Sequence, residues 1–395
     1  MAPTTKRHAL IASLAGATVM AIAPAGAMAG PESSTTWAQV PSPNQVGSNE
    51  LLGAAGSDAS HVWAVGRVVD VNTNPSAYRS QILRWDGTSW AAAPHPRLAR
   101  NHALRGVTAP RPDVAWAVGT RQRADGGHST LVERWDGARW RTVTTPNPSP
   151  SGLNELAGVD TVPGAPTNVW AVGSYSKPNG SFGTLKLILR RTGGAWQSLP
   201  SPTFTPEDHL EAVDAAGPSN AWAVGWGSTS PFGGTAVGIA LRWNGTTWTS
   251  VPLPQPSQVM LFGVAALAPD DVWAVGHTYP GGPHWIPLVL HWDGSAWTRA
   301  AIPAFPNGGQ LRDVVALAPD NVFAVGLDGE GSNARSLVLH WDGAQWTREG
   351  TPSPPGGPKL FGAAAIGPST VWGVGYRYDQ GAGVNRTFTI RTDNG

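Results

Sequence analysis

The five residues Val62-Trp63-Ala64-Val65-Gly66 form an apolar run that ends in glycine, and closely similar runs recur along the whole chain. The aromatic residues of the seven runs are Trp63, Trp116, Trp170, Trp222, Trp273, Phe323 and Trp372. Successive aromatic residues are 53, 54, 52, 51, 50 and 49 positions apart. A nearly constant period of about 50 residues is typical of repeat architectures, so the sequence predicts one domain built from similar units.

Two further landmarks follow the same period. A leucine stands twelve residues before each aromatic residue, or fourteen in the third copy: Leu51, Leu104, Leu156, Leu210, Leu261, Leu311 and Leu360. A hairpin signal comes later in the unit, first as Arg84-Trp85-Asp86-Gly87 and again at 134–137, 242–245, 291–294 and 340–343. The third unit has Gly193-Gly194 at this place. Asp-Gly and Asn-Gly favour the positive φ of a two-residue turn between antiparallel strands.

Each unit is therefore predicted to hold four strands. In the fifth copy these cover residues 261–267, 272–275 and 288–292, followed by a strand after the turn at 293–294. A helical repeat is excluded because no window holds an apolar period of 3.6 residues between its Gly and Pro residues. Four antiparallel strands per repeat make one propeller blade. The sequence predicts an all-β, seven-bladed β-propeller of four-stranded blades.

The two ends of the chain complete one blade together. The seventh copy begins at Leu360 and ends where its fourth strand should start, whereas residues 36–43 match the fourth strand and linker of the other units. We therefore expect the N-terminal strand to close the seventh blade and to remove the exposed edges there. The predicted blades cover about 50–101, 102–152, 153–207, 208–259, 260–308, 309–358, and 359–395 completed by 35–43.

The order of these motifs resembles the kelch repeat and the galactose-oxidase-like propellers. The pairing of Asp271-Val272-Trp273-Ala274-Val275-Gly276 with a later Trp-Asp-Gly-x-x-Trp hairpin is also similar to repeats of uncharacterised exported bacterial propellers. The chain departs from kelch in having one glycine after the second strand and a shorter final turn. The resemblance implies the propeller fold and, as one alternative, a role as a protein-interaction scaffold. The copper-radical site of galactose oxidase needs a Cys cross-linked to Tyr, and this chain has no Cys.

The N-terminus has the pattern of an export signal. Lys6 and Arg7 precede a mostly apolar stretch at 9–23, and the small residues of Ala27-Met28-Ala29 suit a signal peptidase. We expect a signal peptide at 1–29, a single propeller domain at 30–395 and a secreted, extracellular protein. No later stretch is apolar enough to cross a bilayer, so no membrane association is expected after cleavage. We also expect a monomer.

Charge excludes one class of partner. Removing Lys6 and Arg7 from the 27 basic residues leaves 25 against 26 acidic ones, a net charge of −1. A nucleic-acid-binding protein needs a basic surface to gain from counterion release, so no nucleic acid is expected as a partner. The absence of Cys also excludes disulfides, thiolate metal ligands and a cysteine nucleophile.

The first group of candidate ligand-binding residues lies in the loops between the second and third strands. Eighteen of the 20 Trp fall on repeat positions and are expected to pack between blades. These loops and the linkers between units emerge on one face of a propeller and vary among the copies, and function on a rigid scaffold usually sits in such loops. The candidates are Trp226, Trp285, Tyr78, Tyr175, Tyr279, Tyr376, Tyr378, His277 and His284.

The second group of candidates lies on the same face, where each first strand begins beside the central channel. Charged and polar residues there differ from blade to blade, which is what a ligand site at the channel mouth requires, although strand-entry residues also tolerate polarity without any function. The candidates are His102, Arg105, Glu155, His209, Glu211 and Arg312.

No catalytic motif accompanies these candidates. The chain holds no Gly-x-Ser-x-Gly elbow, His-Glu-x-x-His pair or phosphate-binding loop, and residues 70–74 start like a calcium loop but continue with Pro75. We expect no cofactor and no metal. The leading hypothesis is a non-catalytic binding protein that recognises carbohydrate or a surface polymer through the variable face. The alternatives are a polysaccharide lyase or glycosidase at the channel mouth, and a kelch-like scaffold with a protein partner.

Overall fold

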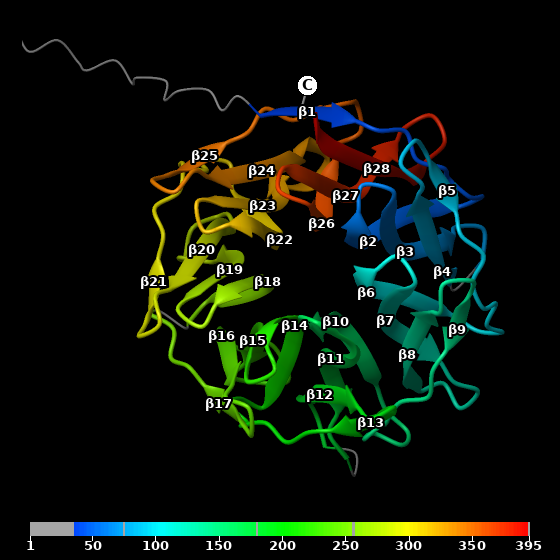
Figure 1. Ribbon diagram of the computed structural model, residues 1–395, viewed down its shortest axis with the longest axis vertical. Coiled ribbons are helices and arrows are strands. Elements are labelled where there is room, and N and C mark those ends of the chain that lie inside the picture. Colours follow the sequence, from blue (N-terminus) through cyan, green and yellow to red (C-terminus); the bar gives the residue numbers. More distant parts are fainter. Residues whose placement is uncertain (1–34, 74–75, 179–180, 255–256, 394–395) are drawn as a thin grey trace, which may run out of the picture. The chain divides into compact units, whose positions relative to one another are not determined.

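The computed structural model describes residues 35–73, 76–178, 181–254 and 257–393, and these form seven four-stranded antiparallel sheets. The sheets are blades around a central channel, as Figure 1 shows. The prediction of an all-β, seven-bladed β-propeller is confirmed. The predicted signal peptide, residues 1–29, lies outside the described residues. Within the described ranges, no helix is long and apolar enough to cross a membrane.

The strands of each blade follow one another from the channel outward. The first three blades are β2 (Ser48–Asp58), β3 (His61–Asp70), β4 (Ala77–Trp85) and β5 (Trp90–Ala92); β6 (His102–Arg111), β7 (Val114–Gln122), β8 (His128–Trp135) and β9 (Trp140–Thr142); and β10 (Asn154–Val162), β11 (Ala165–Ser176), β12 (Thr184–Thr192) and β13 (Ala195–Ser198). The fourth and fifth are β14 (Glu207–Gly217), β15 (Asn220–Ser228), β16 (Ala236–Trp243) and β17 (Trp248–Ser250); and β18 (Val259–Ala268), β19 (Asp271–Thr278), β20 (Ile286–Trp292) and β21 (Trp297–Arg299). The sixth is β22 (Gly309–Ala318), β23 (Asn321–Asp328), β24 (Arg335–Trp341) and β25 (Trp346–Arg348), with a short 3-10 helix, η2 (Gly331–Asn333), before β24. The seventh combines β26 (Lys359–Ile366), β27 (Thr370–Asp379) and β28 (Val384–Asp393) with β1 (Thr36–Gln39).

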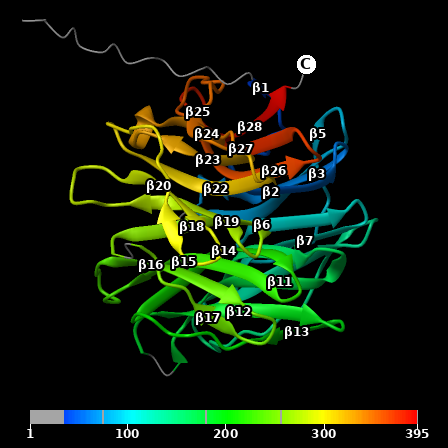
Figure 2. The same cartoon turned by 60° about the vertical axis from the view of Figure 1, so that its left-hand side comes forward.

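The hydrophobic core lies between neighbouring blades. The indole of Trp63 in the first blade packs on Trp135 and Trp140 of the second, with ring centroids 5.1 and 5.0 Å away. Trp170 packs in the same way on the indoles of the fourth blade. Neighbouring blades are thereby held face to face, and inner strands of adjacent blades such as β18 and β22 run side by side (Figure 2). The tryptophans on repeat positions therefore join the blades.

Each inner strand carries a β-bulge immediately after the repeated leucine. In the first blade Leu51 pairs with Gly66 and Gly53 pairs with Val65, so the residue between them has no partner in the ladder. The bulge residues of the seven blades are Leu52, Arg105, Ala157, Glu211, Phe262, Arg312 and Phe361. We call them the mouth ring, because all seven line the channel. A bulge re-aims a side chain in this way without breaking the rest of the sheet.

The bulge also explains the glycine that ends each repeated run. A Cβ atom on Gly66 would lie 1.9 Å from the carbonyl oxygen of Glu50 on the inner strand. At the other six equivalent glycines the corresponding distance is between 1.9 and 2.1 Å. No side chain fits at that distance, so the repeated glycine and the mouth ring have one structural cause.

Replacing one of these glycines is expected to destabilise the whole domain. In Gly119→Ala the new Cβ would meet the carbonyl oxygen of Ala103 at 2.0 Å. Forcing these strands apart should cost about 1–3 kcal/mol or more in unfolding free energy, measured by denaturant titration. The control is Gly217→Ala in β14, where a Cβ meets nothing within 4 Å. Equal unfolding midpoints for the two variants would contradict this explanation.

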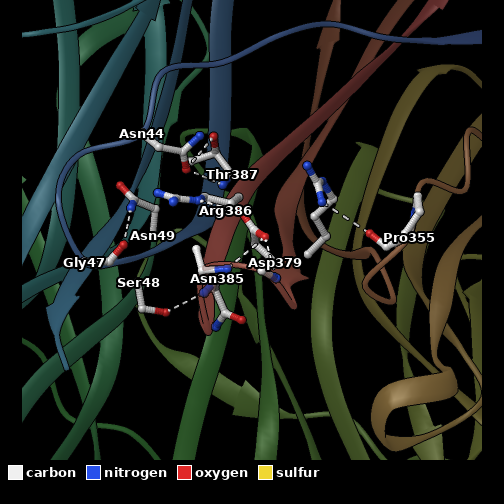
Figure 3. Close-up of polar contacts among 12 residues, drawn as sticks. Asn44, Gly47, Ser48, Asn49, Pro355, Asp379, Asn385, Arg386 and Thr387 are labelled. Atoms are coloured by element: carbon white, nitrogen blue, oxygen red, sulfur yellow. Dashed lines mark hydrogen bonds and ion pairs between the residues drawn. The ribbon is translucent and has the colours of Figure 1, made fainter.

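The N-terminal strand closes the ring, as the sequence predicts. β1 pairs antiparallel with β28, with Trp37 opposite Thr392. Hydrogen bonds continue along the segment that follows β1, as Figure 3 shows. The backbone N–H of Thr387 donates to Asn44 Oδ1 at 2.8 Å, and that of Asn385 donates to Ser48 Oγ at 3.0 Å. The seventh blade is therefore held together by both ends of the described chain.

Candidate functional site

The central channel holds a cavity of about 750 Å³. Its walls are the inner strands of all seven blades, which present mainly Gly, Ala and Val. The mouth ring differs from this lining, because it brings two arginines, one glutamate and two phenylalanines to one level. These residues lie near the start of the inner strands, on the face where the loops between second and third strands emerge. The predicted face and the channel mouth therefore coincide.

Arg312 lies between two aromatic rings of the mouth ring. Its guanidinium carbon is 4.5 Å from the ring centre of Phe262 and 5.6 Å from that of Phe361. Cations at such distances are attracted to the faces of aromatic rings. The guanidinium also donates from Nη2 to Gln310 Oε1. Two neighbouring blades thus hold this cation at the channel wall.

Ring contacts continue outward from both phenylalanines. The ring of Phe361 is stacked on that of Tyr376, with centroids 5.0 Å apart. On the other side Phe262 contacts His277 at 5.1 Å, and His277 contacts Trp285 at 4.5 Å. Tyr279 then contacts Trp285 at 5.1 Å. These seven residues, which we call the aromatic arc, span the fifth to seventh blades: Tyr376, Phe361, Arg312, Phe262, His277, Trp285 and Tyr279.

His277 is the least exposed member of the aromatic arc, with 3% of its surface accessible. Burial, together with the positive charge of Arg312, lowers the pKa of His277 to about 3. The imidazole is therefore neutral at physiological pH. Its Nδ1 atom is buried and has no hydrogen-bond partner among the described residues.

A second group of contacting side chains, the polar arc, lies on the third and fourth blades and reaches Arg105 of the second. Glu211 Oε1 accepts a hydrogen bond from Trp226 Nε1 at 3.0 Å, and Glu211 Oε2 lies 4.0 Å from Arg105 Nη1. Burial raises the pKa of Glu211, and the charge of Arg105 opposes this shift. His209 stacks on the indole of Trp226 at 4.4 Å, so one face of that indole is covered.

The polar arc extends from His209 to a second carboxylate. His209 Nδ1 is 3.2 Å from Ser174 Oγ, and Ser174 Oγ donates to Glu155 Oε1 at 3.1 Å. Five predicted residues, Arg105, Glu155, His209, Glu211 and Trp226, therefore meet in one network. Ser174 was not among the sequence candidates, although it follows the repeated glycine of its blade.

Other predicted residues lie apart from the two arcs. His102 is buried, and its Nδ1 accepts a hydrogen bond from the backbone N–H of Ser80 at 3.1 Å. Burial lowers the pKa of His102 to about 4. His102 therefore belongs to the protein interior and does not face the channel mouth. His284 Nδ1 lies 3.6 Å from Glu330 Oε1, beside Trp285. Tyr175 packs against the core between the second and third blades. Tyr78 is half-buried and Tyr378 is exposed.

Two further pairs of aromatic residues were not predicted. Phe262 and Phe361 belong to the mouth ring, and the register of one residue after the repeated leucine would have found them. Phe182 and Phe232 lie on loops of the third and fourth blades, with ring centroids 4.9 Å apart. They are 70% and 74% exposed.

Three aspartates deeper in the channel connect neighbouring blades. In each case a backbone N–H of the next blade donates to the carboxylate. The N–H of Ala215 donates to Asp160 at 3.0 Å, and that of Ala363 donates to Asp313 at 2.9 Å. Asp214 accepts from the fifth blade in the same way. Burial raises the pKa of all three, to about 7 for Asp313, and the charge of Asp214 contributes at Asp160. Among the described residues, no three His, Cys, Asp or Glu side chains are grouped so that they could hold a metal ion.

Comparison with known proteins identifies the fold. No family model matches the chain, and no curated protein sequence matches it. Among solved structures, YCF48 bound to D1 peptide is 14% identical with a TM-score of 0.55, and the match covers 91% of this chain and 97% of that one. A protein of unknown function from Dyadobacter fermentans is 14% identical with a TM-score of 0.52, over 90% and 97% of the two chains. YCF48 from Cyanidioschyzon merolae is 16% identical with a TM-score of 0.52, over 90% and 98%.

At these identities the likeness shows a shared propeller fold and nothing finer. The resemblance of the repeat to kelch and galactose-oxidase-like propellers stays a prediction.

Proposed function

We propose that the protein is a non-catalytic binding protein that takes an extended ligand across the mouth ring, and that this ligand is a carbohydrate or another cell-surface polymer. The observation that carries this proposal is the pairing of the aromatic arc with the polar arc around one cavity. Ligand sites combine apolar and aromatic walls with a few polar groups that fix orientation. Sugars suit such a site, because their C–H faces stack on rings and their hydroxyls pair with carboxylates and imidazoles.

A peptide is the second candidate ligand. The solved structure of YCF48 bound to D1 peptide has the same fold, which favours a protein partner. The exposed rings of Phe182 and Phe232 add an apolar contact on the same face. Parallel glycan and peptide arrays with the purified protein distinguish the two candidates, because each predicts signal on one array and none on the other.

Loss of one partly exposed ring of the aromatic arc is expected to weaken glycan binding. Trp285→Ala removes contacts with both His277 and Tyr279. We expect about tenfold weaker binding by calorimetry to the glycan that gives the strongest array signal. Phe232→Ala is the matched control, because it removes an exposed ring from the same face outside the arc. Unchanged affinity in Trp285→Ala, or an array without any glycan signal, would refute the proposal.

A glycosidase is the enzymatic alternative at the same place. The raised pKa of Glu211 suits a general acid, and Glu155 is a second carboxylate in the network. An assay for new reducing ends on each bound polysaccharide tests it. Turnover that is lost in Glu211→Gln would replace the binding role with catalysis.

We further propose that the protein is exported as a monomer after cleavage near Gly30. N-terminal sequencing of protein from the culture medium and light scattering of the purified chain test the two statements.

A further inference from the structure

Arg312 is a half-buried cation that forms no ion pair with a described acidic side chain, and the charge of Glu211 acts on it only from a longer distance. The ion pairs of the mouth involve other arginines: Arg105 lies 4.0 Å from Glu211, and Arg67 lies 2.7 Å from Glu50. The one hydrogen bond of the Arg312 guanidinium within the described chain goes to the neutral Gln310, and its Nε atom is buried without a partner. A desolvated charge that lacks a partner is costly, and proteins keep one where a ligand supplies the opposite charge.

The surroundings of Arg312 favour a planar anion. Phe262 belongs to the fifth blade and Phe361 to the seventh, and the ring centre of each lies within 6 Å of the guanidinium carbon. An arginine held by rings keeps the edge of its plane for hydrogen bonding, and that edge matches the two oxygens of a carboxylate. No other residue of the aromatic arc carries a charge, since His277 is neutral at physiological pH. The attraction for an anion therefore concentrates at one guanidinium between rings.

We infer that Arg312 binds a carboxylate of the ligand, so that the glycan bound at this mouth is acidic and carries uronic acids. In a uronic acid the carboxylate is attached directly to the sugar ring. The carboxylate can thus meet Arg312 while the ring lies against the neighbouring phenylalanines. This inference rests on the proposed function, because it names the class of glycan for the same site. Arg105 has a carboxylate partner within the protein, so the ligand's charge is assigned to Arg312 alone.

The test compares matched glycans that differ only in their charge. Polygalacturonate, alginate and hyaluronan oligosaccharides are each titrated into the full chain beside carboxyl-reduced forms, in which every carboxylate has become a neutral hydroxymethyl group. We expect at least one acidic form to bind ten- to a hundredfold more tightly than its reduced counterpart. The preference should weaken with added salt, since it depends on a charge pair.

Variants then assign that preference to one residue. Arg312→Gln should make the affinities for the acidic and reduced forms equal, and Arg312→Lys should retain part of the difference because it keeps the charge but loses the planar edge. Arg139→Gln, an exposed arginine in the short turn on the opposite face, is the matched control. Thermal midpoints of all variants establish that each is folded.

The outcomes separate the inference from the proposed function. Equal binding of the acidic and reduced forms by the unmodified protein would overturn the inference and leave glycan binding intact. A preference for acid that survives in Arg312→Gln would overturn the assignment to Arg312. Binding of none of these glycans would overturn the inference, and a peptide signal in the array would then overturn the proposed function as well.

Discussion

We expect the unfolding free energy of a chain that begins at residue 46 to be lower by about 4–6 kcal/mol than that of a chain that begins at residue 30. The shortened chain lacks β1, and with it Trp37, which is 7% exposed and contacts Phe323 of the sixth blade at 5.9 Å. Burying an indole removes roughly 150–250 Å² from water, worth about 25 cal/mol per Å². The truncation also uncovers the outer edge of β28, a template for association with other chains.

Guanidinium unfolding followed by tryptophan fluorescence measures this loss, with the chain from residue 30 as the control. Trp37→Ala separates packing from strand pairing, and it should cost about 3–5 kcal/mol by itself. The remaining loss comes from bonds such as that from the backbone N–H of Val40 to the carbonyl oxygen of Thr389, 2.9 Å long. Equal unfolding midpoints for the two chain lengths would show that the ring does not depend on its N-terminal strand.

Glu133→Leu is expected to stabilise the protein by about 1–3 kcal/mol, the desolvation cost of a buried polar group that makes no hydrogen bond. The side chain of Glu133 is 0% exposed, and neither carboxylate oxygen has a hydrogen bond among the described residues. The side chain of His95 lies beside it, with Nδ1 3.4 Å from Glu133 Oε2. The equivalent residues of the other six blades are Leu83, Leu189, Leu241, Leu290, Leu339 and Ile390.

The repeat therefore supplies its own reference for this position. A leucine there fits between Leu131 and Trp135, which belong to the same apolar cluster. The control removes the other residue of the pair. His95→Ala should destabilise the chain, because it leaves the buried carboxylate without a partner. A loss of stability in Glu133→Leu, measured by denaturant titration, would mean that the pair with His95 outweighs the desolvation of Glu133.

The blade count and the closing strand were predictable because both depend on local patterns. The period places Leu, the glycine-ended run and the Asp-Gly turn at regular steps, and the missing outer strand of the last unit matches residues near Trp37. The face that carries the candidate site was also predictable, since loop variability needs only the alignment of the copies. Arg105, Glu211 and Arg312 were found for this reason, as polar residues beside the repeated leucine.

The composition of the site was less predictable, and the β-bulge is the reason. Phe262 and Phe361 stand at the same register as Arg105 and Glu211, but an apolar residue in a strand gives no signal by itself that it faces a channel and not the core. The bulge shifts the register by one residue and turns them to the channel. His102, three residues before Arg105, lies before the bulge and is buried instead. Contacts between blades, such as Arg312 with Phe262, depend on the radius of the closed ring and have no signal in either repeat alone.

The β-bulges also keep the candidate ligand-binding residues of the mouth ring out of the strand pairing, which leaves these positions free to change. A mouth-ring residue forms no rung of the sheet ladder, whereas the leucine before it and the glycine opposite that leucine maintain the blade. Substitution at one such residue therefore leaves the strand pairing intact. Seven independent positions, one in each blade, can vary around an unchanged scaffold, much as hypervariable loops do on an antibody domain. Chains with this repeat could acquire different ligands by exchanging only these residues, and their overall sequence similarity would be a poor guide to what they bind.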